Sequence, residues 1–442
     1  MNNYKNKMFF LFNFFFFFFF FLLFISFNLS IGFFCNIIFF FGFDIYSYLF
    51  CLLSVWIVIL MNCSMKSFWL LKSFKYFNFL SCLILTFLIL SFYVIDFFMF
   101  YLFFEISLIP VVLIIFGWGH QPERISSGFY LFFYTLFASL PLLVCIFLII
   151  SVEGCFNFYI FFYINNLFIS FLLIFAFLVK FPMIFFHLWL PKAHVESPVG
   201  GSMILAGVML KLGGYGLIRL LKFLIHFLLN FNWLFIGISL FSFFYLSLVC
   251  LIQSDLKVLV AYSSVCHMSM VISGIFSVGL FGVLGSLILM LGHGLVSSML
   301  FFYIGILYNF FNSRSFFVIR GLLTISPSLS MMGFFGFMSN LSCPPSMNLI
   351  SEILIISTLI MWSSGLIIFI SLGLFFSAFY SILIFSFIHH GFPSSLIKPF
   401  NIKVFDYLIF FLHLYPIFIM SFNFIYFIYI LFKKFLNKFL KY

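Results

Sequence analysis

Residues 180–211 read KFPMIFFHLWLPKAHVESPVGGSMILAGVMLK, and this stretch decides how the chain folds. It gathers lysines, histidines and a glutamate into a chain of which only 7% is charged. Lys180 and Lys211 each lie within an apolar run long enough to cross a bilayer. An ionisable group at membrane depth is costly, so its presence indicates a partner for the charge or a use for its proton.

The composition places the chain in a membrane. Hydrophobic residues make up 66% of it, and the mean hydropathy is +1.34. A soluble domain carries about 25% charged residues, so this composition leaves too little polar surface for a soluble fold. We therefore predict an all-α, polytopic membrane protein. The 84 phenylalanines are typical of an AT-rich gene, which is compatible with an organelle genome.

Apolar runs divide the chain into about 14 transmembrane helices, since about 20 apolar residues cross the hydrocarbon core. The first two runs can equally form one long helix over 8–43. We expect a single membrane domain, 1–442, made of N-terminal helices (1–95), a first half (96–221), a second half (231–388) and a C-terminal helix with a basic tail (389–442). The predicted spans are 8–27, 28–43, 46–64, 77–95, 97–116, 129–151, 164–186, 199–221, 231–253, 256–279, 281–309, 327–360, 364–388 and 405–432.

Prolines interrupt two of these spans close to an ionisable residue. Pro182 follows Lys180 inside one apolar run, and Pro344 and Pro345 precede Glu352 in another. Proline removes a backbone donor, and in lipid the freed groups must be satisfied by protein or water. Paired broken helices of this kind are typical of inverted repeats. We predict repeats over the fourth to eighth and the ninth to thirteenth helices, with the seventh and twelfth broken.

Basic residues divide unevenly between the two sides of the membrane. The internal loops of one side hold or border only Arg219 and Lys222, although the two chain ends add further lysines to that side. Because positively charged loops face inward, we place the richer set of loops on the matrix or cytoplasmic side. The orientation of the chain in the membrane thereby explains the net charge of +11, and no nucleic-acid partner is expected. The inner set is Lys66, Lys72, Lys75, Arg124, Lys192, Lys257, Arg314, Arg320, Lys398 and Lys403.

Ionisable residues within the spans are the candidates for chemistry. Glu105 is a proton carrier or the counter-ion of a lysine, with a carboxylate buried for packing as the alternative. Lys180 stands at a helix break, where burial and an acidic partner would have opposite effects on its proton affinity. Lys211 lies among glycines that indicate close helix contact, so it should face the bundle interior. His293, between two glycines, and Glu352 complete a candidate proton relay.

Other histidines are weaker candidates. His187, His194 and His267 lie near or within spans, and each is either a satisfied core residue or a relay member. His389 and His390 lie at a span end, where we expect a solvated pair.

The remaining polar residues indicate surface contacts. Asp255 can pair with Lys257 at the mouth of a span, and Lys192 with Glu196 in a polar loop, where an ion pair contributes little. No cysteines have metal-binding spacing, and no phosphate-binding glycine loop or strand pattern is present. We expect no metal, nucleotide, flavin or iron–sulfur cluster in this chain.

Several segments resemble those of one family. They are FFEISLIP (103–110), the stretch 177–216, DLKVLVAYSSVCHMSMVISGI (255–275), HGLVSSMLF (293–301) and PPSMNLISEI (344–353). Together they resemble the chain 4 subunits of mitochondrial NADH–ubiquinone oxidoreductase, which is respiratory complex I. The resemblance extends from about Phe103 to Trp362 and is most specific over 180–216.

The resemblance implies an antiporter-like, proton-pumping subunit in which the two halves are the antiporter-like repeats. It implies that Glu105 is the acidic partner, Lys180 the pumping lysine and Lys211 the connecting lysine. His293 would continue the polar axis toward Glu352, the terminal acid. The matching positions with less defined roles are His187, His194 and His267.

We therefore expect a subunit of the proton-translocating NADH:ubiquinone reductase, with no redox centre in this chain. NADH, FMN, iron–sulfur clusters and ubiquinone would be bound elsewhere in the assembled complex. The expected partners are other complex I subunits, including neighbouring antiporter-like chains, and the lipids of the mitochondrial inner membrane. The alternatives are a stand-alone or Mrp-type cation/proton antiporter subunit and a passive scaffold.

Overall fold

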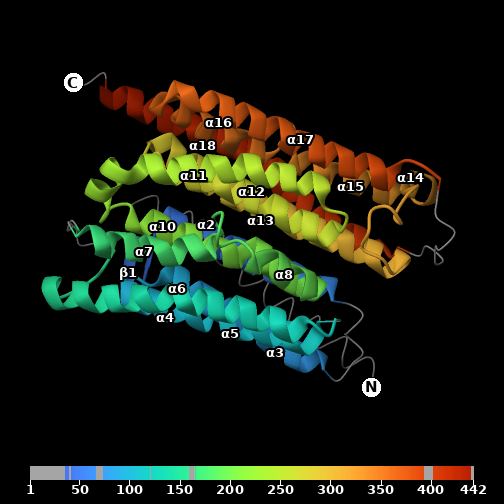
Figure 1. Cartoon of the computed structure of the whole chain (residues 1–442), viewed down its shortest axis with the longest axis horizontal. Helices are drawn as coiled ribbons and strands as arrows, with labels where there is room; N and C mark the ends of the chain where they lie inside the picture. The colour runs from blue at the N-terminus through green and yellow to red at the C-terminus, as the bar shows by residue number, and fades with distance from the viewer. Residues whose placement is uncertain are drawn as a thin grey trace.

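The chain forms a bundle of helices that lie roughly side by side. Helices α3 to α6 occupy one flank and α16 and α17 the opposite flank, with α10, α12 and α13 between them (Figure 1). The computed structural model describes residues 35–38, 41–65, 73–119, 121–158, 164, 166–392 and 402–439, with side chains described from residue 41 to residue 422 of these ranges, residue 43 excepted. The predicted span 8–27 lies outside the described residues.

The elements up to the middle of the chain include both halves of the first broken span. They are β1 (Cys35–Ile38), β2 (Phe41–Phe43), α2 (Ile45–Ser64), α3 (Phe74–Tyr93), α4 (Phe97–Ile106), α5 (Leu108–Trp118), α6 (Arg124–Glu153), α7 (Leu167–Lys180), α8 (Trp189–Glu196), α9 (Val199–Ile204), the π-helical turn η3 (Leu205–Met209) and α10 (Leu210–Leu220).

The remaining elements include the second broken span. They are α11 (Ile225–Ile252), α12 (Leu256–Phe276), α13 (Leu280–Phe311), α14 (Leu322–Ile325), α15 (Pro327–Asn340), α16 (Met347–Trp362), the short 3₁₀ turn η4 (Ser364–Leu366), α17 (Ile367–His389) and α18 (Val404–Phe439).

Within the described residues, ten helices are long and apolar enough to cross a membrane. The helices α7 and α16 are apolar but shorter, because each is one part of a broken span. The chain is therefore a predominantly helical, polytopic membrane protein, as its composition predicts.

Both predicted helix interruptions are present. Pro182 lacks the amide hydrogen that would reach the carbonyl of Leu178, and the amide of Met183 takes that carbonyl instead, at 3.1 Å. The indole of Trp189 donates to the carbonyl of Val179 at 3.1 Å. At the second interruption, Asn348 Nδ2 donates to the carbonyl of Ser339 at 3.0 Å. The amide of Ser342 also donates to the Ser339 carbonyl, at 3.3 Å. Protein groups therefore hydrogen-bond to backbone carbonyls beside both breaks at membrane depth.

The prediction of a helix over 28–43 is wrong for its described part. There β1 and β2 form an antiparallel hairpin, and Phe41 bridges to Val94 at the end of α3. Asp44 gives the reason, because its carboxylate accepts the amide of Ser47 at 2.8 Å, and Ser47 Oγ accepts the amide of Asp44 at 2.9 Å. This capping box starts a helix at residue 45, and a carboxylate there would destabilise the end of a preceding helix.

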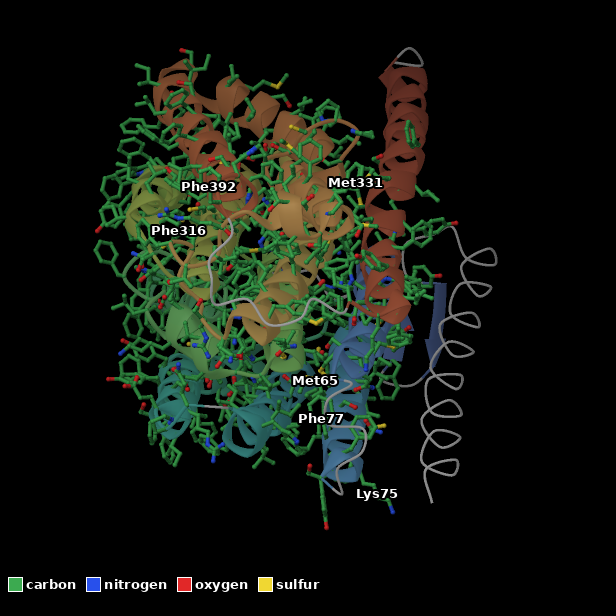
Figure 2. The ribbon with its side chains drawn as sticks, turned by 90° about the vertical axis from the view of Figure 1, so that its right-hand side faces the viewer. Met65, Lys75, Phe77, Phe316, Met331 and Phe392 are labelled. Atoms are coloured by element: carbon green, nitrogen blue, oxygen red, sulfur yellow. The ribbon has the colours of Figure 1, made fainter. Side chains whose placement is uncertain are left out.

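The most enclosed spans are the α9–η3–α10 segment and α13. The most apolar 18-residue window of each is 100% buried, compared with 28% for the segment Ser364–His389. Side chains fill the spaces between the helices, whereas Lys75 lies at the edge of the molecule and points away from the bundle (Figure 2). Polar residues carried by these two spans are thus shielded from lipid.

Helix α18 is attached to α2 through a carbonyl that a proline frees. Pro416 lies inside α18 and has no amide hydrogen for the carbonyl of Leu412. Trp56 of α2 donates its indole N–H to that carbonyl at 3.1 Å. A defect in one helix is therefore satisfied by its neighbour.

Candidate functional site

Lys180 is buried at the C-terminal end of α7, with 3% of its surface exposed. Its ammonium donates to the carbonyl of Phe104 at 2.9 Å and lies over the ring of the same residue. The helical path is interrupted at Ser107, between α4 and α5, three residues before Pro110. The break in α7 and the irregular turn after α4 therefore meet at one buried lysine.

Glu105 follows the residue that Lys180 contacts. Its side chain is half-buried, and its Oε1 has no hydrogen-bond partner among the described residues. Among the described residues, no ion pair joins Glu105 to Lys180. The direct pair predicted from the sequence is absent from this structure, but the two groups occupy adjacent positions around Phe104.

Lys211 lies one residue into α10, directly after the π-helical turn η3. It is fully buried, and its ammonium donates to the carbonyl of Ala206 within that turn. The same ammonium lies 3.1 Å from Nδ1 of His293 on α13. The glycines beside His293 allow this approach, because a side chain at position 294 would lie 3.0 Å from the carbonyl of Gly207.

His267 connects His293 to the second break. The two imidazole rings lie 5.5 Å apart between centroids, and His267 Nδ1 lies 3.7 Å from Glu352 Oε1. Glu352 Oε2 accepts the hydroxyl of Ser342, in the connection between α15 and α16, at 2.6 Å. Glu352 is 6% exposed, and Ser342 is half-buried.

These residues form a line of neighbouring polar side chains, Lys211, His293, His267 and Glu352. Lys211 lies within hydrogen-bond distance of His293, whereas neither ring nitrogen of His267 has a hydrogen-bond partner among the described residues. Each member can hold or release a proton, or accept one on a ring nitrogen or a carboxylate. The line runs through the buried centre of the bundle to a broken helix. Of the histidines with less defined roles, His267 is therefore the one whose contacts place it inside the line.

His194 and His187 lie outside this line. His194 is 1% exposed, stacks on Phe301 at 4.6 Å, and neither of its ring nitrogens has a partner among the described residues. His187 lies in the connection between α7 and α8, with its ring 6.1 Å from that of Tyr262. A buried imidazole with unpaired nitrogens is costly unless water reaches it.

The interval between Lys180 and Lys211 is not bridged by a direct contact. No hydrogen bond between described residues joins Lys180 to Lys211. The glycine-rich face of α10 packs there against α7, since a side chain at Gly213 would lie 3.0 Å from the amide nitrogen of Phe181. Proton exchange between the two lysines would therefore need water or a side-chain movement.

Comparison with known proteins shows the family of the chain. The family described as "NADH:quinone oxidoreductase/Mrp antiporter, TM" matches residues 95–378. The chain belongs to this family. NADH-ubiquinone oxidoreductase chain 4 of Ceratitis capitata is 44% identical over 89% of this chain and 89% of the relative. The chain 4 protein of Aedes aegypti is 47% identical over 81% of each.

Chains of two solved structures share the fold. A chain of respiratory complex I from Thermus thermophilus with bound NADH has a TM-score of 0.80 at 24% identity, covering 86% of this chain and 81% of that one. A chain of the Mrp complex from Dietzia sp. has a TM-score of 0.71 at 18% identity, covering 82% and 69%. Both likenesses are likenesses of fold.

The buried contacts of Lys257 were not predicted from the sequence. It is 7% exposed, and its ammonium donates to the carbonyls of Ser197 at 2.7 Å and Val195 at 3.1 Å, at the end of α8. The predicted pairing with Asp255 is therefore wrong. The available signal was its place just inside an apolar span, where a lysine needs internal acceptors.

The predicted surface pair of Lys192 and Glu196 is also wrong. The ammonium of Lys192 lies over the ring of Tyr130, 4.0 Å from its centroid. Glu196 is 6% exposed, and with the side-chain amide of Gln121 in its favourable orientation, the Gln121 nitrogen donates to Glu196 Oε1 at 2.6 Å. Its burial follows from the folding of α8 back into the bundle.

His389 differs from the solvated residue that was predicted. It is 0% exposed, its Nε2 lies 2.9 Å from the hydroxyl of Tyr303, and its Nδ1 lies 2.8 Å from the carbonyl of Phe385. His390, beside it, is exposed as expected. Both ring nitrogens of His389 are occupied, so it joins α17 to α13.

Proposed function

We propose that this chain is the chain 4 type, proton-translocating membrane subunit of an NADH:ubiquinone oxidoreductase, located in the mitochondrial inner membrane and encoded by the organelle. The observation that carries the proposal is the buried line of Lys211, His293, His267 and Glu352. Ionisable side chains are costly in a membrane interior, and those found there mark functional sites. Identity of 44% to a chain 4 protein supports the assignment to this complex.

The proposed mechanism is a relay of coupled protonation states. Lys180 takes up or releases a proton as its electrostatic interaction with Glu105 changes, and Lys211 conducts it toward the second half. His293 and His267 accept and donate it in turn, because one neutral ring nitrogen accepts while the other donates. Glu352 is the terminal acid, and Ser342 stabilises its carboxylate through the 2.6 Å hydrogen bond.

The proposal includes partners, because the polar residues reach half-buried positions. Glu105 and Ser342 are both partly exposed, and they lie at opposite flanks of the bundle, Glu105 on α4 and Ser342 in the connection between α15 and α16. Neighbouring antiporter-like subunits of complex I would extend the relay there. NADH, FMN, iron–sulfur clusters and ubiquinone would be held by other subunits, and electron transfer among them would drive the relay.

The two halves would form inverted repeats. The breaks after Lys180 and before Glu352 support this arrangement, since each places an ionisable residue beside an interrupted helix. In this proposal 96–221 and 231–388 are the repeats, and the helices before and after them complete about 14 spans.

Neutralising Lys211 tests the proposed function. In membranes whose complex I carries Lys211→Gln, we expect proton translocation per NADH oxidised to fall at least twofold, with the complex assembled. Lys75→Gln, at the edge of the molecule, is the matched control and should keep the native ratio (Figure 2). Undiminished translocation by assembled Lys211→Gln complex would overturn the proposal in favour of a passive scaffold.

An Mrp-type antiporter subunit is the alternative, because the intramembrane charges would serve either activity. The likeness to the Mrp complex chain is one of fold, at 18% identity. Co-purification of the chain with flavin and iron–sulfur subunits separates the two, since an Mrp-type subunit would have no such partners.

A further inference from the structure

A buried ion pair joins α10 to the start of α2, away from the polar line. Arg219 and Asp44 are 5% and 7% exposed, and Arg219 Nη2 donates to Asp44 Oδ1 at 2.7 Å while Nη1 donates to Oδ2 at 2.5 Å. Arg219 Nη2 also donates to the hydroxyl of Tyr215 at 2.8 Å. That hydroxyl donates to the carbonyl of Phe92 on α3 at 2.9 Å. We call Asp44, Tyr215 and Arg219 the outer clamp, because the sequence places Arg219 near the outer side.

The hydrogen bonds of the outer clamp restrain the positions of its side chains. The guanidinium meets the carboxylate through two parallel hydrogen bonds, which fix both distance and orientation. An arginine does not lose its proton in a protein, so it cannot serve as a proton carrier. The carboxylate of Asp44 has a second role, because it also accepts a hydrogen bond from the amide of Ser47 and caps α2. Outside the spans, burial and the charge of Arg219 both lower the pKa of Lys222.

The ring of Tyr215 adds a second constraint. It packs edge-on against Phe92 of α3 at 5.2 Å and Phe50 of α2 at 5.9 Å, and lies 5.8 Å from Phe100 of α4. The clamp therefore fixes α10 against three other helices near its C-terminal end.

Lys211, Tyr215 and Arg219 are spaced four residues apart, so they lie along one face of α10. Lys211 is about 12 Å from Arg219 along the helix axis, from a rise of about 1.5 Å per residue. On its other side, Lys211 follows the π-helical turn η3, whose wider hydrogen bonding joins Leu210 N–H to Leu205 O. A change of one residue in that register would rotate α10 by about 100°.

We propose that the outer clamp sets the rotation of α10 and thereby holds the Lys211 ammonium at His293, making Arg219 a positioning residue for proton transfer. The clamp fixes α10 at the end opposite the irregular turn that precedes Lys211. This inference rests on the proposed function, because it gives Lys211 a proton to pass on. It also assigns a role to Asp44, which lies before the matched family region at 95–378.

The test separates positioning from simple stabilisation. Removing Arg219 alone leaves a buried carboxylate unpaired and can prevent folding. The double variant Asp44→Asn/Arg219→Gln removes both charges, so no buried charge remains uncompensated. We expect the assembled complex with this double variant to translocate at most half the native number of protons per NADH. Arg320→Gln, which removes an exposed arginine, is the matched control and should keep the native ratio.

Tyr215→Phe keeps the test decisive if the double variant does not assemble. It retains the ring and removes the hydroxyl between Arg219 and the Phe92 carbonyl, and we expect a smaller but measurable loss in the same ratio. A native ratio in assembled complex, for either variant, would overturn the positioning role. Lys211→Gln is measured in parallel. If it loses translocation while the clamp variants keep theirs, only the clamp fails; if it also keeps the native ratio, the proposed function fails.

Discussion

At the scale of single residues, the position of His267 adds a member to the proposed proton relay. Among the weaker candidates of the sequence, it is the one that lies between His293 and Glu352. A lone histidine in an apolar helix gives no signal of its partners, because those partners come from α13 and α16. Its role depends on the packing of three helices and could not be predicted from its neighbours in the chain.

Replacing His267 should interrupt the line without removing a charge pair. His267→Leu fills the space and leaves no ring nitrogen between His293 and Glu352, so we expect the rate of proton translocation to fall about a hundredfold or more, the scale of a lost acid–base group. The rate is measured in proteoliposomes containing the assembled complex. His390→Leu, at an exposed histidine, is the control. A native rate for His267→Leu would show that protons bypass this position.

Lys257 belongs to stability rather than to the relay. Lys257→Met would leave the carbonyls of Val195 and Ser197 without their donor in a buried position. We expect a loss of about 1–3 kcal/mol, the cost of an unsatisfied buried polar group. Thermal unfolding of the purified complex measures it, with Lys403→Met at an exposed lysine as the reference. Equal stability of the two variants would contradict the assignment.

At the scale of elements, α18 and α2 depend on each other through one carbonyl. Trp56→Phe removes the donor to Leu412 O, which Pro416 leaves without a backbone partner. We expect Trp56→Phe to destabilise the complex by about 1–3 kcal/mol. In the background of Pro416→Ala the loss should be much smaller, because residue 416 then supplies its own amide hydrogen. The double-variant cycle is read from thermal unfolding, and equal losses in both backgrounds would disprove the compensation.

The helix breaks could be predicted from the sequence, whereas the N-terminal hairpin could not. Pro182, Pro344 and Pro345 act locally, because each removes an amide hydrogen from the helix, although Pro416 inside α18 shows that a proline does not always end one. The run of apolar residues before Asp44 is compatible with helix or strand, and pairing with Val94 decides the outcome. The partners of Lys257 and Asp44 were missed for the same reason, since they lie 60 or more and 175 residues away.

At the scale of the whole molecule, ionisable residues extend from α4 at one flank to the α15–α16 break at the other (Figure 1). From Lys211 to Glu352 the members of the polar line are neighbours, whereas no hydrogen bond between described residues joins Lys180 to Lys211. We expect ordered water in this interval, because it alone would join the two lysines without a large movement. A structure of the assembled complex at a resolution that reveals water tests this. A dry, close-packed interval would require a side-chain swing instead.

The account depends most on Glu352 being a proton acceptor at the end of the line. Its most direct test is proton translocation per NADH oxidised, measured on assembled complex carrying Glu352→Gln. The substitution keeps shape and hydrogen bonding but cannot ionise, and Glu153→Gln, at an exposed carboxylate, is its control. We predict that Glu352→Gln lowers the ratio at least twofold while Glu153→Gln keeps it. A native ratio for Glu352→Gln in fully assembled complex would contradict the account.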